Sequence, residues 1–299
     1  MHIPETPGGR RSGSTVLESR LDAWARDRLA AARSRGTRTF VIEFAAFIVK
    51  QGWAALFGFL LLCTLVAARV LYPDDFPIAR NDALTIAAVL IQIAMIRAGL
   101  ETRRELRVIV LFHIVGTVME IFKTDAGSWS YDEGGVLRIA GVPLFSGFMY
   151  AAVGSYMVRV HRLFDLRFTT YPPVRLTALI AAAVYLNFFT HHRLPDARWV
   201  LLAAVVLVWA RTVMTVRLLE RSIRLPLLPV FAGLAAVIWV AENIATRVGA
   251  WAYPDQVDGW EPVSASKVVS WFLLMIVSVV LVTWVYPPRP PENSAKLGR

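Results

Sequence analysis

The chain has 299 residues, of which 56% are hydrophobic and 18% are charged, and its mean hydropathy is +0.52. A soluble domain of this size is about a quarter charged. The composition therefore argues against a disordered chain, a disulfide scaffold and a nucleic-acid-binding domain. The net charge of +10 is instead typical of a membrane protein whose basic loops set its topology and contact anionic lipid.

Apolar stretches long enough to cross a hydrocarbon core, about 20 residues each, recur along the chain. They are residues 51–72, 82–100, 105–124, 141–161, 175–191, 197–217, 226–246 and 266–286. The sequence therefore predicts an all-α polytopic membrane protein with about eight transmembrane helices. The apolar run that begins near Phe40 carries Glu43 and Lys50, and we interpret this leading piece as an interfacial or tilted extension. The first 36 residues lack the apolar core of a signal peptide.

Basic residues alternate between the two sides of these predicted spans. The N-terminal segment, alternate connections and the tail together carry 24 Lys and Arg residues, whereas the remaining connections carry 8. The positive-inside rule then places both termini in the cytoplasm.

The Arg-rich N-terminal segment contains a helix signal of its own. Thr15 and Glu18 have the spacing of a capping box. Leu17, Leu21, Trp24 and Ala32 share one helical face, which predicts a basic amphipathic helix on the cytoplasmic leaflet. A disordered basic tail is the alternative.

One motif occurs twice at an offset of 122 residues. The residues Glu120, Thr124, Gly127, Trp129 and Tyr131 recur as Glu242, Thr246, Gly249, Trp251 and Tyr253, and Pro73-Asp74 recurs as Pro195-Asp196. We expect two fused four-helix units, residues 41–165 and 166–287, between an N-terminal segment 1–40 and a tail 288–299. Because four is an even number, both units enter the membrane in the same direction, as parallel repeats.

Each motif copy places a carboxylate near the end of a helix and aromatic residues after it. Glu120 and Thr124 share a helix face, Gly127 is a natural helix terminator, and the aromatic residues fold over the exit. Glu120 and Glu242 are therefore candidate catalytic residues. The alternative is an aromatic belt at the membrane interface with a snorkelling carboxylate.

The two halves also differ in their polar residues. His113 lies two turns before Glu120 on the same face, at membrane depth, and is the third candidate catalytic residue. It is equally consistent with a buried, hydrogen-bonded histidine that fixes helix packing. The candidate substrate-binding residues are Thr124, Trp129, Tyr131, Asn243, Thr246, Trp251, Tyr253, Asn187 and His191.

Recognised metal and cofactor patterns do not occur in the sequence. The histidines lack the spacing of a metal site, and phosphate-binding loops, nucleophile elbows and redox motifs are absent. We therefore expect no cofactor and no metal. Ser146-Gly147 is interpreted as small-residue helix packing.

Several strings resemble a bacterial family of integral membrane proteins of unknown function typified by YoaT. They are residues 71–75, 113–124, 127–131, 141–150, 187–192 and 241–243. The resemblance covers most of residues 45–288 and implies a multi-pass protein of the bacterial cytoplasmic (inner) membrane, without an activity.

A second, local resemblance covers about 40 residues. Glu120, Thr124, Gly127 and Tyr131, followed by Gly141-Val142-Pro143, are similar to the membrane carotenoid hydratases, which add water to an isoprenoid double bond. The second half of the chain lacks the Gly-Val-Pro string, so the resemblance does not imply a second site of this kind in that half.

Three functions fit these features. The first is a membrane-embedded enzyme that acts on an isoprenoid or other lipid, with Glu120 as general acid and Glu242 or His113 handling water. The second is a proton- or cation-coupled transporter of a small solute, and the third is a non-catalytic membrane partner protein. The expected ligands are membrane lipid and a hydrophobic or small molecule rather than nucleic acid, and a homo-oligomer remains open.

Overall fold

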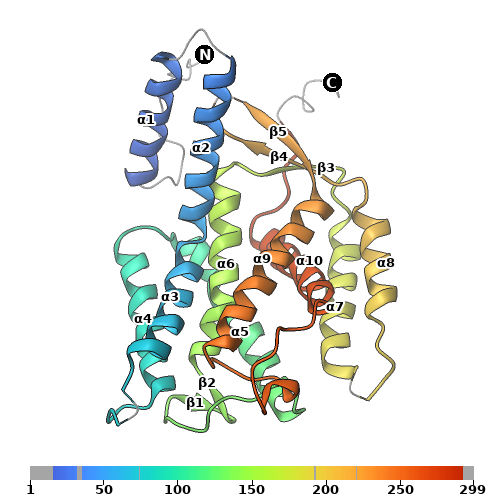
Figure 1. Cartoon of the computed structure of the whole chain (residues 1–299). Coiled ribbons are helices and arrows are strands. Elements are labelled where there is room, and N and C mark those ends of the chain that lie inside the picture. Colours follow the sequence, from blue (N-terminus) through green and yellow to red (C-terminus); the bar gives the residue numbers. More distant parts are fainter. Residues whose placement is uncertain (1–15, 32–35, 74, 192, 220, 292–299) are drawn as a thin grey trace.

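The computed structural model describes residues 16–31, 36–73, 75–191, 193–219 and 221–291. Within these residues the chain is mostly helical, and short strands occur in the connections (Figure 1). The α-helices are α1 (Val16–Ala31), α2 (Gly36–Ala54), α3 (Leu56–Leu71), α4 (Arg80–Arg97), α5 (Arg103–Asp125), α6 (Phe145–Leu163), α7 (Val174–Thr190), α8 (Arg198–Trp209), α9 (Leu227–Arg247) and α10 (Lys267–Val285). The other elements are β1 (Arg138–Ile139), β2 (Val142–Pro143), β3 (Arg167–Thr169), β4 (Val213–Arg217), β5 (Ser222–Pro226) and the 3-10 helix η1 (Pro254–Gln256).

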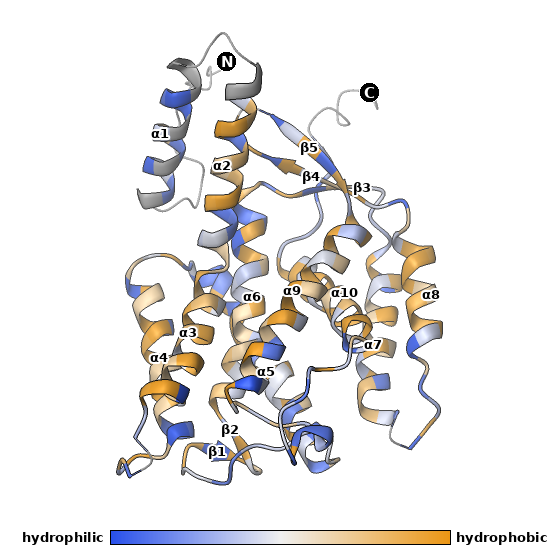
Figure 2. Ribbon diagram, viewed as in Figure 1, coloured by the Kyte–Doolittle hydropathy of each residue, from blue (hydrophilic) through white to orange (hydrophobic). Residues whose placement is uncertain are grey.

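Each of the eight predicted spans contains all or most of one helix, from α3 to α10. Figure 2 shows apolar residues concentrated along these helices and hydrophilic residues in the connections at both ends. By length and composition, however, only α9 and α10 among the described helices are able to cross a membrane alone. The pair α2 and α3 passes the same test together but is bent by 61°. The mostly helical class is thus confirmed, and the described residues include two helices, or three segments if the bent pair is counted as one, that are long and apolar enough to cross a membrane.

The sixth predicted span, 197–217, is wrong in its second half. Helix α8 ends at Trp209, and residues 213–217 form β4, the middle strand of an antiparallel sheet with the order β3-β4-β5. Val213, Thr215 and Val216 are β-branched and favour a strand. A continuous apolar run cannot distinguish such a strand from the end of a helix.

Close contact between α5 and α6 is made possible by glycines. A Cβ atom on Gly116 would lie 2.2 Å from Cγ of Tyr150, and one on Gly147 would lie 2.5 Å from Oγ1 of Thr117. The helices therefore approach each other too closely for any side chain at these positions, as expected for packing through small residues. Helix α10 packs against α5, α6, α7, α8 and α9 and contributes much of the main core.

Helix α1 packs on α2 and is tied to the core by charged residues. Asp22 pairs with Lys50 at 2.6 Å, and Glu18 pairs with Arg162 and accepts a hydrogen bond from Trp53 Nε1 at 3.3 Å. Trp24 is 56% exposed. Thr15, Ala32 and the side chains of Leu17 and Leu21, on which the predicted amphipathic face depended, lie outside the described residues.

Candidate functional site

Both copies of the motif end a helix in the same way. After α5, Gly127 has φ +69°, and after α9, Gly249 has φ +70°. Residues with a side chain rarely adopt this left-handed conformation, whereas glycine does so at little cost. In each copy the glycine turns the chain back toward the end of its own helix, which brings the following aromatic residues over the glutamate.

Glu120 of α5 is buried and is held by three hydrogen-bond donors. Its Oε2 accepts from Tyr131 Oη at 2.6 Å and from Trp129 Nε1 at 2.8 Å, and its Oε1 accepts from Tyr150 Oη at 2.6 Å. The motif supplies the first two donors, and α6 supplies the third. This carboxyl group is therefore fixed in both position and orientation.

Glu242 of α9 has a similar but not identical environment. The hydroxyl of Tyr253 donates to its Oε1, and the indole of Trp271 donates to its Oε2 at 2.7 Å. The glutamate-to-tyrosine bond thus occurs in both copies over the same separation of 11 residues. The indole partner differs, because Trp271 comes from α10 rather than from the motif.

The tyrosines of the two motifs remain hydrogen-bond donors over a wide pH range. Burial, and then the neighbouring Glu120 carboxylate, raises the pKa of Tyr131 well above its ordinary value. Burial and the Glu242 carboxylate likewise raise the pKa of Tyr253. Each hydroxyl therefore keeps its proton and its bond to the glutamate.

The two motif loops lie against each other. Ser130 N–H donates to the Ala252 carbonyl at 2.9 Å, and Ala252 N–H donates to the Ser130 carbonyl at 3.0 Å. The rings of Trp129 and Tyr253 meet edge to face at 6.0 Å. Lys267, at the start of α10, places its ammonium group 4.2 Å from the Tyr253 ring centre. The surroundings of Glu120 and Glu242 are thus in direct contact through these aromatic and charged groups.

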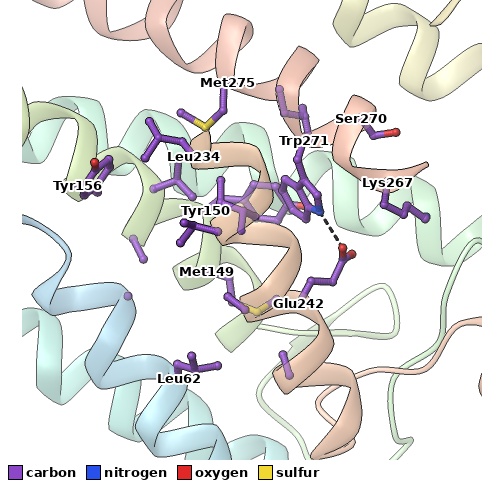
Figure 3. A pocket seen from close by; sticks show the side chains of 18 of the residues that line it. Leu62, Met149, Tyr150, Tyr156, Leu234, Glu242, Lys267, Ser270, Trp271 and Met275 are labelled. Atoms are coloured by element: carbon purple, nitrogen blue, oxygen red, sulfur yellow. Dashed lines mark hydrogen bonds between the residues drawn. The ribbon is translucent and has the colours of Figure 1, made fainter. Parts of the chain in front are cut away.

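Glu120 and Glu242 line the same cavity, whose volume is about 890 Å³. On α9 its lining extends from Val230 to Ala245, and 15 residues of helix span about 20 Å. The walls are mostly aliphatic and aromatic side chains from α3, α6, α9 and α10. Figure 3 shows Met149, Leu234 and Met275 along the cavity and Glu242 with Lys267 at one end, hereafter the glutamate end. The site is therefore a long apolar cavity with charged groups at one end.

Most of the predicted site residues meet at this cavity. Besides the two glutamates, its lining includes Trp129, Tyr131, Trp251, Tyr253, Asn187 and His191. Asn187 Nδ2 donates to Asp196 at 3.1 Å, and a ring nitrogen of His191 lies 3.3 Å from Lys123 Nζ.

Four predicted site residues lie outside the described lining. His113 packs edge to face on Phe148, with ring centres 4.7 Å apart, and faces α6. Thr124 lies on the last turn of α5 and is half-buried. Asn243 and Thr246 hold the loop after α9: Asn243 Oδ1 accepts from the backbone of Val263 at 2.9 Å, and Thr246 Oγ1 accepts from the indole of Trp260 at 3.1 Å.

Sequence reasoning did not select four of the polar residues that line the glutamate end. Tyr150 lies three residues after Gly147 on α6, and its place at the end of the Gly141–Tyr150 string was the available signal. Trp271, Lys267 and Arg198 carried no such signal, because their role depends on how α8 and α10 pack. Among the described residues, no group of three or more His, Cys, Asp or Glu side chains is placed to hold a metal ion.

Comparison with known proteins identifies relatives over most of the chain. Residues 43–279 match the family described as "Protein of unknown function (DUF817)". The uncharacterized protein YoaT of Bacillus subtilis (strain 168) is 45% identical over 239 residues, which cover 79% of this chain and 90% of YoaT. A crystal structure of a cross-linked MvINS trimer aligns with 64% of this chain and 98% of its own, at 15% identity and a TM-score of 0.47, a likeness too weak to support an argument. By the family match and the similarity to YoaT, the chain belongs to the DUF817 family.

Proposed function

We propose that this protein is a membrane-embedded enzyme that acts on an isoprenoid or other lipid by acid–base chemistry. The observation that carries the proposal is that two buried carboxyl groups, Glu120 and Glu242, line one long apolar cavity. An apolar cavity of this length suits a hydrocarbon chain, and a few convergent polar groups at one end suit a reacting centre.

The proposed chemistry is addition of water to a carbon–carbon double bond, or migration of that bond. A carboxylic acid gives its proton to one alkene carbon, and the cation that forms on the other carbon either gains water or loses a neighbouring proton. The second carboxylate accepts the proton released in that step. Trp129, Trp251 and Tyr253 line the same cavity, and the faces of aromatic rings stabilise a nearby cation.

The hydrogen bonds favour different roles for the two carboxyl groups. A carboxylate can accept about four hydrogen bonds. Among the described residues, Glu120 accepts three and Glu242 accepts two. Glu242, with fewer donors, is thus better suited to hold the proton that it gives to the alkene, and Glu120, whose ionised form is stabilised by three donors, is the carboxylate that accepts the released proton. This exchanges the roles that the sequence alone suggested.

We also propose that α3 to α10 are eight membrane spans in two parallel repeats, with both termini in the cytoplasm of a bacterial inner membrane. The repeat is supported by helix ends at the sequence offset of 122: α5 and α9 end at Asp125 and Arg247, and α6 and α10 share both bounds after the shift. The reciprocal bonds of Ser130 and Ala252, also 122 residues apart, are those expected where a two-fold axis passes between the copies. The location is supported by the apolar helices and the distribution of basic residues.

The transporter alternative is less well supported by the lining of the cavity. A path for a polar solute needs polar groups or water along its length, whereas here the charged groups gather at one end. A non-catalytic partner role does not account for the two buried carboxyl groups, Glu120 and Glu242, whose burial is costly in free energy.

The test is mass spectrometry of total lipid extracts from cells that express the wild type, Glu120→Gln or Glu242→Gln at matched levels. The proposal predicts a lipid in the wild-type extract whose mass or retention differs by water or by an isomerisation, and its loss in both variants. Tyr72→Phe, which changes a residue outside the described cavity lining, is the control and should behave as the wild type. Identical lipids in all four extracts would contradict the proposal.

A further inference from the structure

The cavity is open on one side, between α3 and α9. Phe59 of α3 and Val237 of α9 both line the cavity, yet they are 62% and 65% exposed to the outside. Gly52 and Gly233 also line it, and a Cβ atom on either would have nothing within 4 Å. We call the opening bordered by these four residues the portal.

The seam between the same two helices is closed at the glutamate end. There, Leu65 of α3 and Ala245 of α9 belong to one buried cluster, together with Ala250 and Tyr131. The portal is therefore confined to the part of the cavity that is lined by aliphatic side chains and glycine. A molecule that passes through it meets apolar walls first and charged groups only further in.

The charged groups of the glutamate end balance one another. This end holds two acidic side chains, Glu120 and Glu242, and two basic side chains, Lys123 and Lys267, so the acidic and basic groups are equal in number. Arg198 pairs with Asp196 at 3.1 Å, which adds no net charge. A ligand with an anionic phosphate would face two buried carboxyl groups, whereas an uncharged hydroxyl group could accept from a lysine and donate to a carboxylate.

We infer that the occupant is a single-chain amphiphile with a small uncharged head, such as a long-chain or isoprenoid alcohol, which enters sideways from the bilayer through the portal. Its head lies at the glutamate end, and its chain extends along α9 toward Gln51 and Tyr156 at the far end of the lining. This inference rests on the proposed function for the identity of the cavity as the substrate site. It adds the route and the chemical class of the ligand.

The inference is tested by photolabelling of the full-length protein in lipid nanodiscs with a diazirine derivative of hexadecanol. The wild type should be labelled on α3 and α9, and unlabelled hexadecanol should compete at least fivefold better than hexadecyl phosphate. Gly233→Trp places a large side chain in the open space of the portal and should reduce labelling at least fivefold. The control is Ala236→Trp on the same helix, exposed and outside the described lining, which should label as the wild type.

Several results would overturn the inference. Labelling of Gly233→Trp at the wild-type level would exclude the portal, and equal or better competition by hexadecyl phosphate would exclude an uncharged head. Gly52→Trp blocks the same opening from the α2 side and replaces Gly233→Trp if that variant does not fold. The lipid extracts of cells with Glu120→Gln and Glu242→Gln separate this inference from the proposed function. If labelling of the wild type depends on the portal while the wild-type and variant extracts contain the same lipids, the binding site is retained and the proposed chemistry is rejected.

Discussion

Replacing Gly116 by alanine should destabilise the protein through the side chain that helps to hold Glu120. The added Cβ would lie 2.2 Å from Cγ of Tyr150, so the ring must move by more than about 1 Å to reach ordinary contact. Overpacking of this kind costs about 1–3 kcal/mol. The displaced hydroxyl would also lose its 2.6 Å bond to Glu120, and a bond to a charged group contributes about 1.5–3 kcal/mol.

Alanine is a better helix former than glycine by about 1 kcal/mol, which partly offsets these losses. We therefore expect Gly116→Ala to lower the free energy of unfolding by about 2–4 kcal/mol, measured by denaturant titration of the purified protein in detergent micelles. Two controls isolate the cause. Gly233→Ala, which adds a methyl group in open space, should be neutral or stabilising, and Gly116→Ala in a Tyr150→Ala background should become stabilising. If Gly116→Ala alone stabilised the protein, the close packing of α5 and α6 described above would be refuted.

Three further predictions concern stability. Arg162→Ala, which removes the buried pairs with Glu18 and Glu105, should cost about 3–5 kcal/mol, whereas Arg167→Ala at a partly exposed pair should cost at most about 1 kcal/mol; equal costs in denaturant titration would contradict this. Gly127→Ala should cost about 1–2 kcal/mol because of the left-handed backbone, and a neutral effect on the melting temperature would argue against the turn. Burial, and then the nearby carboxylate, raises the pKa of Tyr131 in the folded protein. Its contribution to the free energy of unfolding is therefore present below pH about 10 and is lost above that pH, where the tyrosine of the unfolded chain ionises. Tyr131→Phe should reduce the fall of the free energy of unfolding above pH about 10, and an unchanged pH dependence would contradict the assignment.

The places of α3 to α10 could be predicted because each of these helices lies in an apolar run, although the end of α8 could not. The repeated Glu-x3-Thr-x2-Gly-x-Trp-x-Tyr pattern also predicted that the aromatic residues fold over the end of the helix that carries Glu120, since the glycine is a recognisable turn signal. The same spacing rule that we applied at Thr15 and Glu18 would have found the capping box that Thr102 and Glu105 form at the start of α5.

What could not be predicted depends on contacts between distant elements. Trp271 is one of several tryptophans in apolar segments, and only the packing of α10 against α9 places its indole on Glu242. His113 has the helical spacing that would place it on the same face as Glu120. Because Gly116 and Gly147 have no side chains, α6 packs closely against that face of α5, and the imidazole of His113 packs on Phe148. The strand β4 was missed because β-branched apolar residues are compatible with either a strand or a membrane helix.

The central claim is that Glu120 and Glu242 transfer protons to and from a lipid in the cavity. The most direct measurement is incubation of the purified protein with a total lipid extract in deuterium oxide, followed by mass spectrometry of the lipids. Protonation of an alkene carbon predicts deuterium at a non-exchangeable carbon position of one lipid class, and its absence with Glu120→Gln and Glu242→Gln. Lipids without carbon-bound deuterium after incubation with the wild type, or equal incorporation by the variants, would contradict the account.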